Sequence, residues 1–297
     1  MVLVVAGGAA WLAVYERNRM AAASPTGMLQ RLPPENATVL FVDFDTLRRS
    51  GVLKLLAATK SAQEPDYEAF VRATGFDYQR DLDLAAVSFS SDGEFFVVKG
   101  RFDWEKLRAY AQGQGGGCDG RFCRMQGSTP ARRISFLPLA TNLMALAVST
   151  DNSAAMRLAE PHTAAVQPLD VPRDPVWLSI PAESLKAPGQ LPSGASFFTT
   201  ALSSADKILL SLGSEGEKLE VRLLVTCRTS DDAAALAGQL QHATSLVREM
   251  MAREKQPPNA KDLSGVLTAG VFEQSGRRVL GRWPLPTAFL ESLAGGG

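Results

Sequence analysis

The sequence predicts an α+β protein with two similar antiparallel sheet-plus-helix units in tandem after an N-terminal membrane-anchor helix. The first observation is a repeated pattern, because each half of the chain reads strand, helix, hairpin, helix, hairpin, helix. The second is the stretch 161–192 between the halves, which holds seven of the seventeen prolines and resists regular structure. The third is an apolar run at the start of the chain, which is typical of a membrane segment.

The apolar run Val2–Tyr15 carries no charged side chain and ends at Glu16 and Arg17. A spanning helix needs about 20 apolar residues, so we expect Met1 to be a late start that omits a basic leader. A signal-peptide core and a buried core helix are the alternatives. Charged residues occupy the place of a cleavage site, which favours an uncleaved anchor. We expect a single-pass protein of a bacterial inner membrane with its body in the periplasm or outside, although the arginines behind the run, taken alone, favour the cytoplasm.

Composition bounds the rest of the chain. The expected segments are an anchor or signal segment 1–19, a linker 20–36, a first α+β unit 37–160, a Pro-rich linker 161–175 and a second α+β unit 176–294. The body is globular, because 45% of the residues are hydrophobic. Lysine plus arginine equals aspartate plus glutamate at 31 each, so we expect no nucleic-acid partner.

Local signals place the elements of the first unit. Ser91-Asp92-Gly93 is a hairpin turn, because Asp-Gly supplies the positive φ of tight turns. Asp103 is a natural N-cap, with Phe102 and Leu107 at the positions of a hydrophobic staple. In order, we expect strand Val39–Val42, helices Thr46–Ala58 and Asp66–Thr74, strands Ala86–Ser90 and Glu94–Phe102, a helix after Asp103, strands Arg133–Leu139 and Leu143–Ser149, and helix Asp151–Glu160.

The second unit repeats this order. A long helix starts at Ser230 with two carboxylates in its first turn, where they meet the positive end of the helix dipole. Its apolar stripe from Leu236 to Met250 keeps spacings of four and three and predicts cover for a sheet or a partner helix. In order, we expect strand Val176–Ile180, a helical piece Ala182–Lys186, strands Lys207–Leu212 and Lys218–Cys227, the long helix, strands Val266–Phe272 and Arg277–Pro284, and helix Thr287–Leu293.

Cysteine usage indicates the redox setting. Cys118 and Cys123 enclose four residues after a glycine-rich stretch, and in an oxidising compartment we expect them to form a disulfide. Two unpaired thiols in a loop are the alternative. Cys227 lies on the apolar face of an alternating strand and is expected to be a buried small side chain. Three cysteines and two histidines are too scattered for a zinc site, and we expect no metal or cofactor.

Asp43 and Asp45 are the candidate catalytic residues. The stretch Val39–Thr46 resembles the first motif of haloacid dehalogenase-type phosphatases, in which a strand delivers an aspartate nucleophile and, two residues on, an aspartate acid/base. The resemblance implies a magnesium-dependent phosphohydrolase. Its magnesium-binding acidic pair could be assigned only by forcing Asp231-Asp232 into that role, whereas these residues begin a helix as ordinary caps. It covers only about eight residues, and the alternating hairpins contradict the parallel sheet that this family needs. The structural interpretation makes Asp45 a helix cap and Asp43 a solvated residue at the strand end.

Other catalytic signatures are absent from the sequence, which has no phosphate-binding loop, G-x-S-x-G elbow or H-E-x-x-H pair. The arginine pairs Arg132-Arg133 and Arg277-Arg278 sit at comparable places in the two halves, each beside a hairpin strand. Charged edges that keep sheets apart are the usual reason for such pairs. The alternative is a repeated docking surface for lipid head groups or a protein partner.

The overall layout, including Phe76–Asp83 before the first hairpin, resembles uncharacterised bacterial membrane-anchored envelope proteins with a tandem α+β extracytoplasmic body. The resemblance is diffuse over most of the chain and implies no activity or site. We therefore expect a non-enzymatic binding, assembly or scaffolding module, tethered through its N-terminal segment and meeting an envelope protein partner. The alternatives are a phosphohydrolase using Asp43 and Asp45 and a carrier of apolar ligand or lipid.

Overall fold

The computed structural model describes residues 21–33, 37–57, 65–129, 132–162, 172–185, 202, 205–215 and 218–294. The expected anchor 1–19 lies outside the described residues. Within them, no helix combines the length and the apolarity needed to cross a membrane. The chain is α+β, with long antiparallel strands and several helices, as the sequence predicts.

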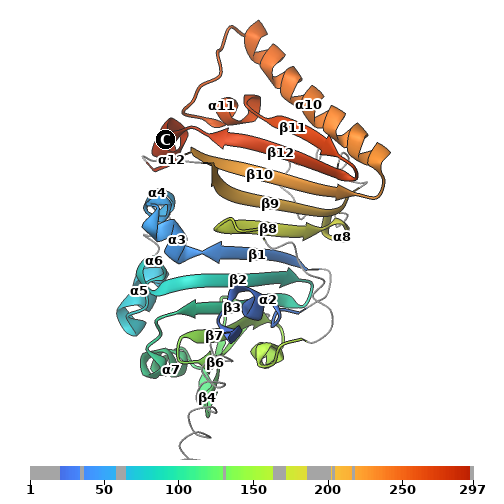
Figure 1. Cartoon of the computed structure of the whole chain (residues 1–297). Helices are drawn as coiled ribbons and strands as arrows, with labels where there is room; N and C mark the ends of the chain where they lie inside the picture. The colour runs from blue at the N-terminus through green and yellow to red at the C-terminus, as the bar shows by residue number, and fades with distance from the viewer. Residues whose placement is uncertain are drawn as a thin grey trace, which may run out of the picture. The chain divides into compact units, whose positions relative to one another are not determined.

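The chain folds as two compact units, and each unit draws on two stretches of sequence (Figure 1). The first consists of residues 1–35 and 69–169, and the second of residues 36–68 and 170–297. The expected boundaries differ from this division, because they assign residues 37–68 to the first unit.

Strand β1 (Thr38–Asp43) shows why residues 36–68 go with the second unit. It pairs antiparallel with β8 (Val176–Pro181), with Val39 opposite Ser179. The rings of Phe41 and Trp177 stack across this pair at 5.5 Å between centroids. Sequence order alone does not reveal this pairing, because the partner strand lies beyond the whole first unit.

The described strands of the first unit form an antiparallel sheet in the order β2-β3-β7-β6-β5-β4. Both predicted hairpins are present, since Ser90 pairs with Gly93 and Ala140 with Leu143. Gly93 has a φ of +142°, a value that side chains other than glycine adopt with strain. The strands are β2 (Leu82–Ser90), β3 (Gly93–Gly100), β4 (Gly117–Asp119), β5 (Phe122–Gln126), β6 (Arg133–Ala140) and β7 (Leu143–Ser149).

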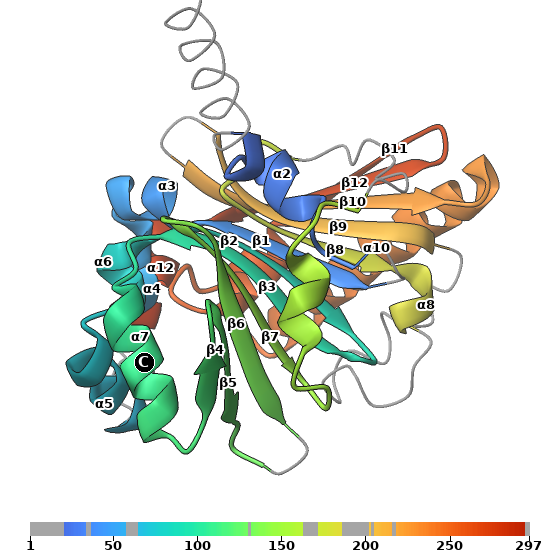
Figure 2. The ribbon, with the colours of Figure 1, turned by 90° about the horizontal axis from the view of Figure 1, so that it is seen from below.

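Helices pack on the first unit's sheet at two places (Figure 2). Helix α2 (Pro25–Leu29) packs on β2 and β3, and the 3₁₀ helix η2 (Ala154–Leu158) packs on β3, β6 and β7. Arg31 joins these two helices, because its guanidinium donates to the carbonyl oxygens of Leu158, at 3.2 Å, and Ala159. Helix α7 packs against the short strands β4 and β5. The helices of this unit are α2 (Pro25–Leu29), α5 (Pro65–Thr74), α6 (Tyr78–Asp81), α7 (Trp104–Gly113) and η2 (Ala154–Leu158). The first four residues of α5, up to Glu68, belong to the stretch assigned to the second unit.

The described strands of the second unit form an antiparallel sheet in the order β1-β8-β9-β10-β12-β11. The new strands are β9 (Ala205–Glu215), β10 (Lys218–Cys227), β11 (Val271–Ser275) and β12 (Arg278–Leu285). The helices are α3 (Phe44–Arg49), α4 (Val52–Ala57), α8 (Ala182–Leu185), α10 (Ser230–Arg253), α11 (Leu263–Thr268) and α12 (Thr287–Ala294).

Helix α10 covers one face of the second unit's sheet with the first part of the predicted stripe, whereas Met250 at the end of the stripe is 48% exposed. Leu236 and Leu240 are buried against Val225 of β10 and Val279 of β12, with Cys227 fully buried in the same cluster. The predicted helix start is confirmed, because Thr229 caps α10 and its hydroxyl accepts a hydrogen bond from the N–H of Asp232 at 3.0 Å. Burial raises the pKa of the Cys227 thiol, as expected for a packing residue.

Both units contain a hairpin, a helix and a second hairpin with the same spatial order. In the first unit this order is β2-β3-β7-β6, and in the second it is β9-β10-β12-β11. In each unit the last strand of the second hairpin, β7 or β12, pairs with the second strand of the first hairpin, β3 or β10. The two strands that the helix links, one from each hairpin, are therefore not neighbours in the sheet. The units differ in their extensions, because β5 and β4 extend one sheet and β8 and β1 extend the other. The internal duplication stays a prediction.

Three expected elements are wrong in detail. Helix Thr46–Ala58 is broken into α3 and α4, because Gly51 adopts a φ of +77° between them. Strand Val266–Phe272 is helix α11 followed by β11, since Asp262 caps a helix there and accepts from the N–H of Ser264. Helix Asp151–Glu160 shortens to the 3₁₀ helix η2. Around Cys118 and Cys123, where no strand is expected, the chain forms the short strands β4 and β5.

Candidate functional site

Asp43 and Asp45 have structural roles in the second unit. Asp43 caps α3, accepting hydrogen bonds from the N–H and the hydroxyl of Thr46, both at 2.8 Å. Asp45 forms ion pairs with Arg48 at 3.4 Å and Arg49 at 3.1 Å on the same helix. The cap is thus Asp43, not Asp45 as the structural interpretation had it. The described residues contain no group of three or more His, Cys, Asp or Glu side chains placed to hold a metal ion.

These roles predict a contrast between two variants. Asp43→Ala is expected to lower the free energy of unfolding of the second unit by about 1 kcal/mol, the typical cost of losing an N-cap. Asp45→Ala is expected to cost about 0.5 kcal/mol or less, because its ion pairs are exposed. Urea denaturation followed by tryptophan fluorescence measures both. Magnesium-dependent phosphatase activity that Asp43→Asn abolishes would contradict the structural assignment.

The two arginine pairs are placed separately, one in each unit. Arg132 donates to both carboxylate oxygens of Glu94, at 3.0 and 3.1 Å, and Arg277 donates to the carbonyl oxygen of Arg228 at 3.4 Å. Arg133 and Arg278 begin strands β6 and β12 and are exposed. Arg132 is therefore engaged in an ion pair within its own unit, and the repeated docking surface stays a prediction.

The predicted disulfide is confirmed and closes the β4–β5 hairpin. Cys118 and Cys123 pair across the two strands with their Cα atoms 4.0 Å apart. Between the strands runs a two-residue turn, Gly120-Arg121, in which Gly120 supplies a φ of +55°. The Arg121 side chain is thus carried on a turn whose two strands are covalently joined.

Removal of this disulfide is expected to loosen the hairpin. A disulfide that closes a loop of this length lowers the entropy of the unfolded chain, which stabilises the folded hairpin by about 2 kcal/mol. The double variant Cys118→Ser, Cys123→Ser should therefore show faster amide hydrogen exchange over residues 117–126, measured by mass spectrometry. The parent chain in reducing agent is the matched control and should behave like the variant; equal exchange in the oxidised parent and the variant would contradict the prediction.

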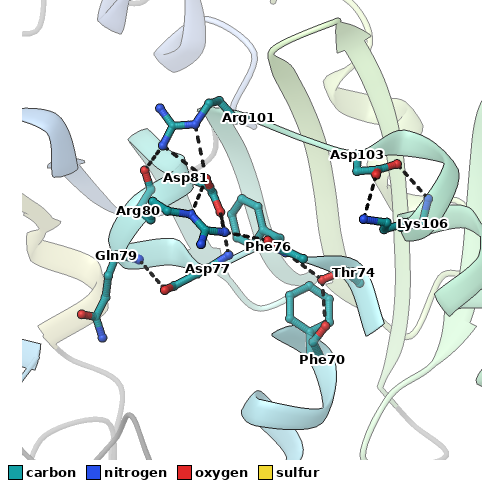
Figure 3. A network of polar contacts seen from close by, with 11 residues as sticks. Phe70, Thr74, Phe76, Asp77, Gln79, Arg80, Asp81, Arg101, Asp103 and Lys106 are labelled. Carbon is teal, nitrogen blue, oxygen red and sulfur yellow. Dashed lines mark hydrogen bonds and ion pairs between the residues drawn. The ribbon is translucent and has the colours of Figure 1, made fainter. Parts of the chain in front are cut away.

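A polar network around Asp81 fixes the chain that leads into α7 (Figure 3). The Asp81 side chain is 9% exposed. Its carboxylate accepts from the Arg80 guanidinium at 2.8 and 3.1 Å, from Arg101 at 3.2 and 3.3 Å, and from the N–H of Asp77 at 3.0 Å. Its own carbonyl oxygen accepts from the N–H of Arg101 at 2.8 Å. The hydrogen bonds from Arg80, together with those from Asp77 and Arg101, lower the pKa of Asp81 to about 2.

The residues that follow Arg101 are held by further contacts up to the first turn of α7. Phe102 stacks on Phe76 at 5.4 Å between ring centroids, and Asp103 caps the helix by accepting from the N–H of Lys106 at 3.1 Å. This hydrogen bond is the main cause that lowers the pKa of Asp103. The Trp104 indole N–H then donates to the carbonyl oxygen of Thr141 in the β6–β7 turn at 2.9 Å. The start of α7 is thus fixed at several points.

Next to this fixed start, the first unit has a groove of about 990 Å³, here called the α7 groove. One wall is the face of α7 that repeats at spacings of three and four, and the other is the end of β6 with the β6–β7 turn. The tip of the disulfide-closed hairpin adds Arg121. The lining residues are Ala22, Trp104, Glu105, Arg108, Ala109, Gln112, Arg121, Pro138, Leu139, Ala140 and Thr141.

Two arginines give the α7 groove its charge. Arg108 is half-buried and Arg121 exposed, and within the described part of the chain neither has a hydrogen bond or an ion pair. Glu105 is the single carboxylate in the lining, so the lining carries one excess positive charge. Lys106, on another face of α7, pairs with Asp103 at 3.3 Å. The groove therefore offers guanidinium donors that the described fold does not use.

The open sheet face of the second unit also has a hollow, of about 540 Å³, but its charges are paired. The Arg222 guanidinium donates to Asp174 at 2.9 Å and to Glu220, and the Ser211 hydroxyl donates to Asp174 at 2.5 Å. Arg282 pairs with Glu273 at 2.9 Å. These internal partners satisfy the polar groups, which makes this hollow the weaker candidate.

Sequence reasoning placed α7 and the disulfide but did not single out the groove. The signal that could have found it is the run Trp104, Arg108 and Gln112, whose spacing of four puts an aromatic, a cation and an amide on one face of a predicted helix. The contribution of Pro138 and Leu139 depends on where β6 lies in space. No sequence spacing reveals that position.

Comparison with known proteins gives a similarity of fold. No family model and no curated protein matches the chain. Crystal form III of TP0453 is similar with a TM-score of 0.52 and 11% sequence identity, over 90% of this chain and 96% of that chain. Crystal form I of TP0453 gives a TM-score of 0.49 at 10% identity, over the same shares. At 11% identity, the similarity to crystal form III concerns the fold alone.

Proposed function

We propose that this chain is a non-enzymatic, membrane-anchored protein of the bacterial cell envelope, and that it acts as a binding module through the α7 groove. The observation that carries the proposal is the pair Arg108 and Arg121, which line one groove without partners among the described residues. A guanidinium that lines a hollow and lacks an internal acceptor is available to a ligand.

Rigid elements present these groups. Helix α7 has a capped N-terminus and is anchored through Trp104 to the β6–β7 turn, and Arg121 lies between the cysteines of a disulfide. Binding sites on elements already held in place lose little conformational entropy when a ligand enters. The disulfide also suits an oxidising compartment such as the periplasm.

The two alternatives have less support. A phosphohydrolase would need Asp43 free to act as nucleophile, whereas both its carboxylate oxygens accept from Thr46. A carrier of apolar ligand would need an uncharged space between sheet and helix, whereas the α7 groove of the first unit is lined by Arg108, Arg121 and Glu105. In the second unit Leu236, Leu240 and Val225 fill that layer.

Photo-crosslinking from the groove tests the proposal. A photoreactive benzoylphenylalanine at Gln112, which lines the groove, is compared with the same group at Glu249, which is exposed on α10 of the second unit. In cells making the full chain, we expect an adduct from position 112 that position 249 does not form. Equal adducts at both positions, or none at position 112, would contradict a binding role for the groove.

Fractionation tests the proposed location. The full chain should sediment with the inner membrane, and deletion of residues 2–19 should release it. Cys118 and Cys123 should react with a membrane-impermeant thiol reagent in spheroplasts only after reduction. Reaction that requires permeabilised membranes would place the body on the inner side and overturn the proposed location.

A further inference from the structure

The α7 groove combines two kinds of surface. Its charged groups are Arg108, Arg121 and Glu105. Its apolar residues include Ala109, which is exposed on α7. Pro138 and Leu139 at the end of β6 are also apolar and are half-buried. A small inorganic ion bound at the arginines would leave the apolar residues without a contact. A wholly apolar ligand would leave the guanidinium groups without an acceptor.

We infer that the α7 groove binds an organic anion, a carboxylate or phosphate joined to an apolar chain. This inference rests on the proposed binding role of the groove and names the class of ligand. Guanidinium groups present parallel N–H donors that fit carboxylate and phosphate oxygens. The anionic group binds at Arg108 and Arg121, and the apolar chain lies along Pro138 and Leu139.

Trp104 adds an aromatic ring to the lining of the groove. Its indole N–H already donates to the carbonyl oxygen of Thr141, so the rest of this lining side chain is apolar. The volume of about 990 Å³ lies at the upper end of the range for small-molecule sites, which is about 300 to 1,000 Å³. The groove therefore has room for an apolar chain beyond the charged group.

The end of β6 is available to a ligand because its pairing with β7 is irregular there. Pro138 has no N–H to donate, and the pairing of β6 with β7 shifts register between Pro138 and Ala140. Irregular pairing of this kind turns the strand locally and re-aims its side chains. Leu139, at the shift, lines the groove.

Isothermal titration calorimetry of the full chain, held in phosphatidylcholine nanodiscs, tests the inference. The probes are hexyl phosphate, hexanoate, inorganic phosphate and hexyltrimethylammonium. We expect hexyl phosphate and hexanoate to bind, inorganic phosphate to bind at least about tenfold more weakly, and the cation not to bind. Arg108→Gln and Arg121→Gln should each weaken hexyl phosphate binding about tenfold, the usual effect of losing one charge-assisted hydrogen bond.

Arg124→Gln is the matched control. Arg124 belongs to the same hairpin as Arg121, but its guanidinium lies over the Phe122 ring, 5.7 Å from the centroid, and it does not line the groove. The affinity of Arg124→Gln for hexyl phosphate should stay within twofold of the affinity of the parent chain. Unchanged circular dichroism establishes that the variants fold.

Three results would overturn the inference: no binding of hexyl phosphate, equal binding in the Arg108→Gln, Arg121→Gln double variant, or inorganic phosphate binding as tightly as hexyl phosphate. An adduct at position 112 together with any of these would leave the binding role standing and reject the ligand class.

Discussion

Replacing Asp81 by alanine is expected to lower the free energy of unfolding of the first unit by about 3 kcal/mol. The substitution removes the carboxylate that accepts hydrogen bonds from the guanidinium groups of Arg80 and Arg101, and it leaves the N–H of Asp77 without its acceptor. Both arginines are more than 60% exposed and can be rehydrated, which limits the loss. Urea denaturation followed by tryptophan fluorescence measures the effect.

A local readout separates this role from general destabilisation. Because Arg101 leads directly into the capped start of α7, Asp81→Ala should speed amide exchange over residues 101–108 more than over α10. Glu94→Ala removes the exposed ion pair with Arg132 in the same unit and is the matched control, expected to cost about 0.5 kcal/mol. Similar losses in the two variants would show that the Asp81 network has no special role.

The Asp81 network also makes stability depend on pH. Hydrogen bonds from the arginines lower the Asp81 pKa from an ordinary 3.8 to about 2 in the folded chain. Because the folded value is the lower one, the stabilisation is fully present above about pH 4 and is lost as the pH falls toward 2, an effect of about 2 kcal/mol. The difference in stability between the parent and Asp81→Asn should shrink by this amount between pH 6 and pH 2; a constant difference would contradict the assignment.

Leu236→Ala is expected to cost the second unit about 3 kcal/mol. Leu236 is 1% exposed and lies where α10 packs on β10 and β12. Truncating a buried leucine removes its transfer free energy and leaves a cavity, which together cost about 2 to 5 kcal/mol. Urea denaturation, with amide exchange to assign the loss to the second unit, measures the result.

Leu246→Ala on the same helix is the matched control, because that side chain is 46% exposed. It should change stability by about 0.5 kcal/mol or less. Equal effects of Leu236→Ala and Leu246→Ala would mean that α10 does not pack as described.

Local chemistry made much of the fold predictable. The turn at Asp92-Gly93, the cap at Asp103 and the stripe of α10 each follow from residues within one turn or one helix. The disulfide was predictable because Cys118 and Cys123 are near in sequence. In each case the interacting groups lie within a few residues of one another.

What sequence reasoning missed depends on distant partners. Gly117–Asp119 has weak strand propensity, and it forms β4 because β5 and the disulfide hold it. Val266 belongs to a helix because its apolar side chain packs with Phe289 and Leu290 of α12. The α7 groove likewise joins Arg108 to Pro138, two residues that no local pattern connects.

The division of the chain into interleaved units bears on how it is synthesised. Residues 69–169 can complete the first unit while the C-terminal half is still being translated, because its other stretch, residues 1–35, has already been made. Strand β1 is made early, yet its partner β8 emerges only after the whole first unit. The second unit is therefore completed last, and β1 stays unpaired with β8 until then. Truncation between residue 169 and the start of β8 at Val176 should leave β1 without β8 and favour capture by chaperones.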